Sequence, residues 1–188
     1  MRKKMSRVVL SLAILASASV ADAKKNTKSA VKKLAADGTL YDAAKGGDLV
    51  TRGCTTEAVD YKNGKALKVV FGAYENWPKV VFSGPWDLTG YTGIEARITN
   101  IGKVNQKIFL QANNPTGAYI NPWNMAVAYN GIAPGETLTL RIDFGYNNFR
   151  TQEKAYALDP SKVISILLGV DHPEGELVFR LESLRAVR

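Results

Sequence analysis

The sequence has one cysteine, Cys54, and one histidine, His172, among 188 residues. A single cysteine excludes an intramolecular disulfide framework and any metal site built from several thiolates. After residue 23 no apolar run approaches the roughly 20 residues that a membrane-spanning helix needs. We therefore expect Cys54 to lie buried as a small apolar residue, and the chain beyond residue 23 to have no membrane span.

The common catalytic patterns are also missing. A Ser-His-Asp or Cys-His mechanism needs a histidine beside its nucleophile, and His172 stands in the turn DHPEGE without a suggested partner. Glycoside hydrolysis needs two carboxylates across a cleft, whereas the acids here stand singly or together in one hairpin. The sequence contains no phosphate-binding loop and no dinucleotide fingerprint. These absences predict a non-catalytic protein without a cofactor.

Residues 1–23 have the features of a secretory signal peptide. Four basic residues precede an apolar run over 8–20, and Ala21-Asp22-Ala23 offers small residues where a signal peptidase cleaves, after Ala23. The alternative, a membrane-anchoring helix, is disfavoured because the apolar run is short. The sequence therefore predicts a secreted or periplasmic protein.

Residues 24–38, KKNTKSAVKKLAADG, form a basic segment that we interpret as a flexible linker. The formal charge of the whole chain is +8, but residues 1–38 hold nine of the 25 basic residues and two of the 17 acidic ones. The remaining body therefore has a charge near +1. Such a neutral body argues against nucleic acid as a partner, although a basic arm can touch an anionic polymer.

Residues 39–188 fit one domain with a substantial core. Their pattern is nearly all strand, with turns at Asn63-Gly64 and in NIGKVN, NNPTG, APGE and DHPEGE. Strands are expected over 55–61, 66–73, 79–83, 93–99, 106–112, 123–129, 136–144, 163–170 and 176–187. A single helical turn is expected at 159–162, capped by Asp159. The pattern predicts an all-β antiparallel β-sandwich, a jelly roll, in a single domain.

Apolar residues alternate with polar ones along most strands, so each strand should have one core face and one polar face. The run VISILLGV over 163–170 is apolar on both sides, which indicates a central strand. In the loop GPWDLTGYTG we expect Trp86, Leu88 and Tyr91 to close one end of the core. Trp77 has turn residues on both sides and could point outward; it would be a ligand aromatic only if it overhangs the loop between Asn113 and Trp123.

Several segments together resemble a known fold family. They are GPWDLTGYTGIEARITNIG (84–102), QANNP (111–115), WN (123–124), IAPGETLTLRI (132–142), DPSKVISILLGV (159–170) and GELVFRLESL (175–184). Their order resembles the galactose-binding-like jelly roll of carbohydrate-binding modules, and in particular the N-terminal non-catalytic sandwich domain of bacterial β-agarases. No segment corresponds to the agarase catalytic barrel. The resemblance implies a sugar-binding or accessory module rather than an agarase.

Sugars are held by aromatic rings that stack on their C–H faces and by amide, guanidinium or carboxylate groups that reach their hydroxyls. Arg97 and Gln111 lie on the polar faces of their strands and could be neighbours on a concave sheet. For Trp123 a place in the core is as well supported as a ligand contact. The candidate carbohydrate-binding residues, in order, are Asn113, Arg97, Gln111, Asn124, Trp123, Tyr119 and Trp77.

The resemblance also implies a possible structural calcium near the chain ends. Glu182 stands where the final strand of related sandwiches presents a carboxylate, and Asp42 or Asp48 could oppose it. Calcium prefers such hard oxygen ligands. The alternative is that these are ordinary exposed acids.

Three functions stay open, in decreasing order of support. The first is an exported carbohydrate-binding module or accessory protein that binds a polysaccharide or oligosaccharide on a sheet face or loop edge. The second is a structural or adhesive envelope protein that binds another protein. The third is a jelly-roll polysaccharide lyase or hydrolase. The sequence does not define the oligomeric state.

Overall fold

A computed structural model describes residues 30–73, 75–115, 125–145 and 158–188 of the chain. One of its two sheets, the six-stranded sheet, has the order β3 (Cys54–Tyr61), β4 (Gly64–Phe71), β11 (Leu177–Val187), β6 (Gly93–Asn100) and β9 (Thr137–Asp143). The short strand β1 (Thr39–Tyr41) also pairs with β11. Every pairing in this sheet is antiparallel.

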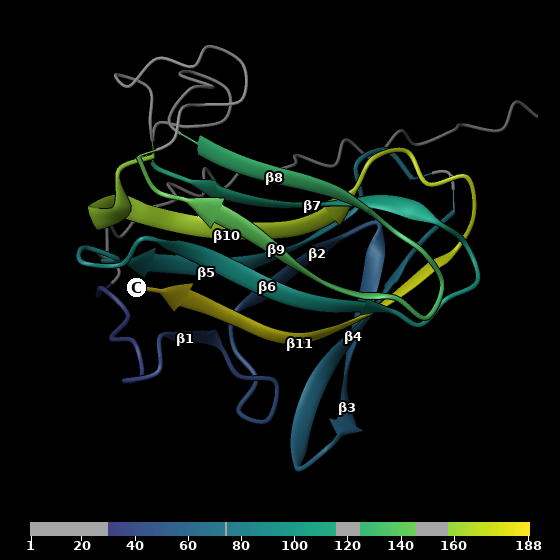
Figure 1. Cartoon of the computed structure of the whole chain (residues 1–188), viewed down its shortest axis with the longest axis horizontal. Coiled ribbons are helices and arrows are strands. Elements are labelled where there is room, and N and C mark those ends of the chain that lie inside the picture. Colours follow the sequence, from purple (N-terminus) through teal and green to yellow (C-terminus); the bar gives the residue numbers. More distant parts are fainter. Residues whose placement is uncertain (1–29, 74, 116–124, 146–157) are drawn as a thin grey trace, which may run out of the picture.

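The second sheet, the five-stranded sheet, has the order β2 (Leu49–Arg52), β5 (Lys79–Trp86), β10 (Val163–Val170), β7 (Gln106–Asn113) and β8 (Met125–Ile132). Its pairings are antiparallel as well. The two sheets pack face to face (Figure 1). The predicted antiparallel β-sandwich is therefore confirmed, and β10 is the central strand that its doubly apolar sequence indicated.

The core lies between the sheets and follows the predicted alternation. Phe71 and Phe179 of the six-stranded sheet are fully buried. In the five-stranded sheet Leu168 is fully buried and Phe82 is almost fully buried. Trp86 is also buried, and Leu88 is fully enclosed in the same cluster, against which Tyr91 packs. The prediction that this loop closes the end of the core is confirmed.

The loops lie at two ends of the sandwich. The β4–β5, β6–β7, β8–β9 and β10–β11 connections gather on the right in Figure 1, and the C-terminus lies at the opposite end. That opposite end also holds the 3-10 turn η2 (Pro160–Lys162), whose Asp159 cap accepts a hydrogen bond from the Ser161 amide as predicted. The sandwich thus presents two sheet faces and two loop ends to solvent.

Part of the segment that we interpreted as a flexible linker lies against the sandwich. Lys32 forms a β-bridge with Trp86, and its Nζ donates to the Ser83 carbonyl at 2.7 Å and pairs with Asp48 at 3.2 Å. Leu34 packs against the core. Lys32 and Leu34 therefore contact the sandwich although they precede position 39. In the part of the chain that the structure describes, no helix is long and apolar enough to cross a membrane.

Candidate functional site: the outer face of the five-stranded sheet

Four aromatic side chains meet on the outer face of the five-stranded sheet. Phe109 of β7 lies between Trp77 of the β4–β5 loop and Tyr129 of β8, with ring centroids 6.0 Å and 5.7 Å away. His172 stands edge-on to Trp77 at 5.7 Å. Such separations are typical of attractive aromatic pairs. We call these four residues the aromatic row.

The row offers two rings to solvent. Phe109 is 2% exposed, while Trp77 and Tyr129 are 38% and 47% exposed. Trp77 has a φ of +56° and His172 a φ of +42°, a left-handed region that bulky residues rarely adopt. The packing of the row holds both residues there against that local cost, which is a pattern found at binding sites.

Gly169 makes room for the row. It stands opposite Phe109 across β10 and β7. A Cβ at position 169 would lie 2.5 Å from Phe109 Cζ and 2.7 Å from the Pro78 carbonyl oxygen. The Phe109 ring therefore lies over the backbone of β10, where only glycine leaves space, and the ring is fixed by its neighbours on both sides.

Polar groups continue the same face along β7. Gln111 Nε2 donates to Asn113 Oδ1 at 2.7 Å, and Asn113 Nδ2 donates to Ser165 Oγ of β10 at 3.1 Å. Because strand residues two apart share a face, this amide chain lies in line with Phe109. Over the four residue steps from 109 to 113 the track extends about 13 Å.

A hollow of about 400 Å³ adjoins the other end of the row. It is lined by Lys107, Tyr129, Asn130, Gly131 and Asp171. Gly131 has open space where a side chain would stand. Tyr129 thus lines the same hollow as Lys107, Asn130 and Asp171, whose side chains are of the kinds that can bind hydroxyls.

The structure brings together only part of the predicted site. Asn113, Gln111 and Trp77 lie on the outer face of the five-stranded sheet, with Trp77 beside Phe109 rather than over the end of β7 at Asn113. Arg97 lies on β6 of the other sheet, so its predicted place beside Gln111 is wrong. On both strands the polar side chains point outward, but the two strands belong to different sheets, so these side chains lie on opposite sides of the sandwich. Tyr119, Trp123 and Asn124 lie outside the described residues.

Arg97 instead belongs to an ion-pair network on the outer face of the six-stranded sheet. Its Nε is 3.0 Å from Glu182 Oε2, and Arg180 Nη2 is 3.1 Å from Glu182 Oε1. Thr99 Oγ1 donates to the same carboxylate at 2.6 Å. The Glu182 carboxylate is thus saturated by partners from its own sheet.

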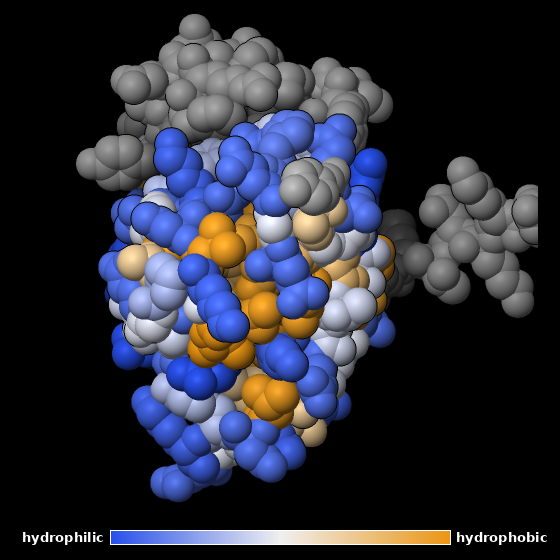
Figure 2. Space-filling view, turned by 90° about the vertical axis from the view of Figure 1, so that its right-hand side faces the viewer, coloured by the Kyte–Doolittle hydropathy of each residue, from blue (hydrophilic) through white to orange (hydrophobic). Residues whose placement is uncertain are grey.

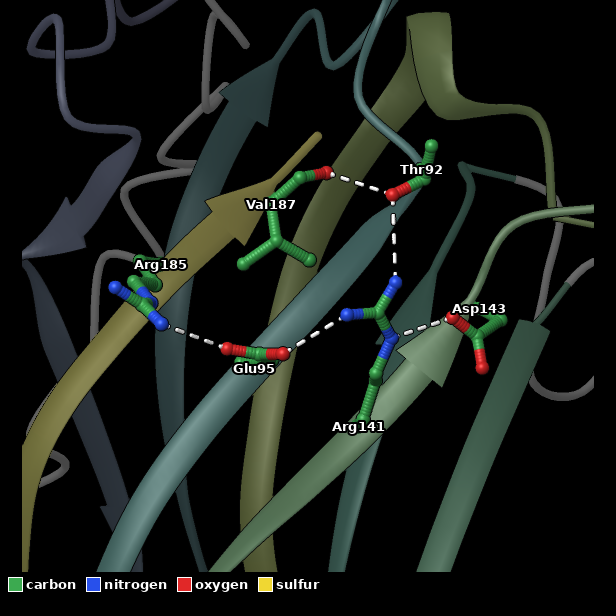
Figure 3. Close-up of polar contacts among 6 residues, drawn as sticks. All are labelled: Thr92, Glu95, Arg141, Asp143, Arg185 and Val187. Atoms are coloured by element: carbon green, nitrogen blue, oxygen red, sulfur yellow. Dashed lines mark hydrogen bonds and ion pairs between the residues drawn. The ribbon is translucent and has the colours of Figure 1, made fainter.

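A second network lies on the same face, across β6, β9 and β11 (Figure 3). Glu95 accepts from Arg141 Nη1 at 2.9 Å and from Arg185 Nη2 at 3.0 Å, and Arg141 Nε donates to Asp143 at 2.5 Å. Hydrogen bonds from Arg185, and then from Arg141, hold the pKa of Glu95 below its usual value against the effect of burial. A hollow of about 410 Å³ lies beside these groups. Within this network each arginine has a carboxylate partner.

The three carboxylates predicted for calcium do not fit that ion as a set. Glu182 is held by two guanidinium groups, Asp42 pairs with Lys45, and Asp48 pairs with Lys32. A cation partner on each acid competes with a metal. Within the described residues no group of three or more His, Cys, Asp or Glu side chains could hold a metal ion. A structural calcium stays a prediction without ligands in this part of the chain.

Sequence reasoning missed Phe109, Tyr129 and His172 as members of one cluster. Alternation along β7 did place Phe109 on the polar face, among Lys107 and Gln111, and an aromatic ring on such a face is the available signal. The partner residues are 20 or more positions away in the chain. Only the strand order brings them together.

No protein-family model and no curated protein sequence matches this chain. Solved structures do resemble it. An exo-beta-agarase superposes with a TM-score of 0.63 at 12% identity, covering 79% of this chain and 24% of that one. The matched part is about a quarter of the length of this agarase and of a second one, AgWH50C.

Two smaller structures match over most of both chains. The family 11 carbohydrate-binding module of cellulase Lic26A-Cel5E from Clostridium thermocellum has a TM-score of 0.53 at 16% identity, covering 78% of this chain and 91% of that one. The CBM22-1 xylan-binding domain from Paenibacillus barcinonensis Xyn10C has a TM-score of 0.50 at 14% identity, covering 82% and 99%. The predicted resemblance is thus confirmed at the level of fold: the chain folds as a jelly-roll sandwich of the carbohydrate-binding-module type.

Proposed function

We propose that this protein is an exported, non-catalytic glycan-binding protein that holds a polysaccharide or oligosaccharide on the outer face of its five-stranded sheet. The observation that carries the proposal is the aromatic row, with the exposed rings of Trp77 and Tyr129 fixed about a buried Phe109. Export is inferred from the signal-like residues 1–23.

The face has the two kinds of group that sugar recognition uses. Ring faces remove the apolar C–H side of a pyranose from water, and because Trp77 and Tyr129 are already packed they lose little side-chain freedom on binding. The Gln111 amide is half-buried and is oriented by its hydrogen bond to Asn113, which is itself buried, so Gln111 is the amide here that can exchange hydrogen bonds with hydroxyls. An extended track of this kind suits several sugar units rather than one.

The structural neighbours add support. One structure shows the family 11 module from Clostridium thermocellum in complex with a beta-1,3-1,4-mixed-linked tetrasaccharide, and another is a xylan-binding domain. Both match this chain over most of their own length. These are properties of those proteins, and the shared fold makes glycan binding the first activity to test here.

The test is retention on insoluble polysaccharides and mobility shift in gels that contain soluble ones, across a panel of plant, algal and microbial glycans. Trp77→Ala and Tyr129→Ala should each weaken binding about tenfold, which corresponds to the loss of roughly 1.4 kcal/mol of stacking. Arg97→Ala is the control, because that side chain lies on the opposite sheet. All three variants should keep the wild-type fold by circular dichroism.

Failure to bind any glycan in the panel would refute the proposal. Equal loss of binding in Arg97→Ala and Trp77→Ala would refute the placement of the site. The supernatants should also be assayed for reducing ends and unsaturated products. Their release by the protein would show an enzyme rather than a binding protein.

A second candidate function, contact with another protein, is favoured by one observation. Figure 2 shows hydrophobic side chains gathered at the end of the sandwich that lies on the right in Figure 1, with hydrophilic side chains around them. In the β6–β7 loop Ile101 and Val104 are each 41% exposed. Crosslinking in intact cells followed by mass spectrometry would recover a specific protein partner, and Ile101→Ser with Val104→Ser should abolish its capture.

A further inference from the structure

Two cations stand side by side on the face that carries the aromatic row. Arg52 of β2 and Lys79 of β5 are directly opposite each other across the strand pair. Lys79 in turn pairs with Gly169, and Gly169 with Phe109, which pairs with Tyr129. Arg52 and Lys79 are therefore at the same level of the sheet as the rings, on the side toward β2.

No described carboxylate lies within ion-pair distance of either cation. On the six-stranded sheet, by contrast, Arg97 and Arg180 share Glu182, and Arg141 and Arg185 share Glu95. Like charges directly opposite on neighbouring strands are destabilising. The same chain thus gives the arginines of one sheet face carboxylate partners and leaves a repulsive pair without one on the other.

Lys79 is placed to gain from an anion. Its side chain is half-buried, and burial, followed by the nearby charge of Arg52, lowers the pKa of the Lys79 ammonium. Both effects mean that the ammonium lacks compensation by water or by a counter-charge. An anionic ligand group at this point would relieve both.

Three acids lie near this end of the sheet, and among the described residues none forms an ion pair with Arg52 or Lys79. Asp171 is bonded to His172. Glu75 packs against the backbone of Gly53 and, with Glu174, lines a separate hollow of about 320 Å³ beside His172. Glu75 is thus near Gly53, the residue after Arg52, yet no ion pair joins a described carboxylate to Arg52 or Lys79.

From this arrangement we infer that the glycan bound by the aromatic row is acidic, with carboxylate or sulfate groups that contact Arg52 and Lys79 while its rings stack on Trp77 and Tyr129. The inference rests on the proposed glycan-binding function and specifies the ligand class. A neutral chain could use the rings and amides alone and would leave the cationic pair uncompensated. An acidic chain uses both sets of groups.

The test compares polymers that share a backbone but differ in charge. The probes are dextran and dextran sulfate, xylan and glucuronoxylan, and methyl-esterified and de-esterified homogalacturonan, each measured by affinity electrophoresis and calorimetry at low and at physiological salt. We expect tighter binding to the acidic member of at least one pair, and weakening of that binding as salt rises, since salt screens exposed charges.

The variant Arg52→Gln with Lys79→Gln removes the pair without removing the rings. It should weaken binding to the acidic polymer by about fivefold to thirtyfold, as expected for two exposed ion pairs, and leave binding to a neutral polymer unchanged. The control Lys62→Gln with Lys65→Gln removes the same charge from the β3–β4 turn of the other sheet and should have no such effect. Trp77→Ala should weaken both kinds of binding.

Each other outcome is decisive. Equal, salt-independent binding to the charged and uncharged members of every pair overturns the inference and leaves the proposed function intact. Equal weakening by the Arg52/Lys79 and the Lys62/Lys65 variants also overturns it, because the attraction would then come from overall charge. Absence of binding to all six polymers together with binding to a neutral glycan of the wider panel overturns the inference alone, and absence of binding to every glycan overturns the proposed function as well.

Discussion

Glu182 should contribute more to folding stability than any other carboxylate on the outer face of the six-stranded sheet. Its side chain is 5% exposed, and it accepts hydrogen bonds from Thr99, Arg97 and Arg180. Replacement by glutamine keeps the shape but removes the charge. Both guanidinium groups then lose their counter-ion, and Arg180 Nε is already buried without a partner.

The magnitude follows from the pKa of this group. Burial alone would raise the pKa of Glu182, but hydrogen bonds from Thr99, Tyr61 and the two arginines outweigh it and lower the pKa from 4.5 to about 2. The folded state therefore binds the proton less tightly than the unfolded state, so the stabilisation is present above about pH 5 and is lost as the pH falls toward 2. A shift of this size corresponds to about 3 kcal/mol, of which about 2 kcal/mol is lost by pH 3.

The assay is urea unfolding of wild type and Glu182→Gln at pH 7 and at pH 3. At pH 7 the variant should be less stable by about 2–3 kcal/mol, reduced from the full value because the arginines are partly exposed to water. At pH 3 the difference should shrink to about 1 kcal/mol. Other carboxylates also titrate in this range, so the difference between the two proteins isolates Glu182.

Glu57→Gln is the matched control, because Glu57 is largely exposed and its oxygen is 3.7 Å from Lys68 Nζ. It should change stability by less than about 0.5 kcal/mol. A loss below that value for Glu182→Gln at pH 7 would refute the reasoning. So would a difference between Glu182→Gln and wild type that stays constant from pH 7 to pH 3.

Three further predictions concern the sandwich itself. Gly169→Ala should lower stability by about 1–3 kcal/mol and shift the Trp77 fluorescence, because the new Cβ meets Phe109, whereas Gly131→Ala should be close to neutral in the same urea titration. Asn114→Ala should lower stability by about 2 kcal/mol, since the Asn114 side chain bonds the Asp159 amide and carbonyl and the Lys162 carbonyl; an unchanged unfolding midpoint would contradict this. Cys54 should react slowly with a thiol reagent at pH 8 in native protein and rapidly in urea, because burial raises the pKa of its thiol and Sγ donates to the Lys79 carbonyl.

The fold could be predicted from local pattern because each strand carries its own alternation. The turn Asn63-Gly64 defined the β3–β4 hairpin, and the doubly apolar run of β10 identified the centre of a sheet. The short strand β2 was missed. Its four residues are too few to show a period, and it is defined by pairing with β5 rather than by its own sequence.

The site could be predicted only in part, because parity along a strand tells which residues share a face and not which sheet that face belongs to. Arg97 and Gln111 show the limit, since both point outward from opposite sides of the sandwich. Asn113 was assigned to the correct sheet face. Its neighbour Asn114 instead donates hydrogen bonds to the backbone around η2. The aromatic row depends on strand order and on Gly169, and neither is visible in a local window.

The contrast between the two outer faces is itself an argument for where a ligand binds. A glycan laid on the six-stranded sheet would have to displace or desolvate ion pairs such as Arg97–Glu182, and loss of water from a charge is expensive even when the pair survives. On the five-stranded sheet, contact with Trp77 and Tyr129 removes apolar surface from water at little cost in side-chain order. Both faces carry cations. The arginines of the six-stranded sheet have carboxylate partners, whereas Arg52 and Lys79 on the five-stranded sheet have none in the described chain. An acidic ligand would therefore gain an interaction there without breaking one. A glycan on the five-stranded sheet would therefore gain both from apolar burial and from the cations without partners. A glycan on the six-stranded sheet would have to desolvate existing ion pairs.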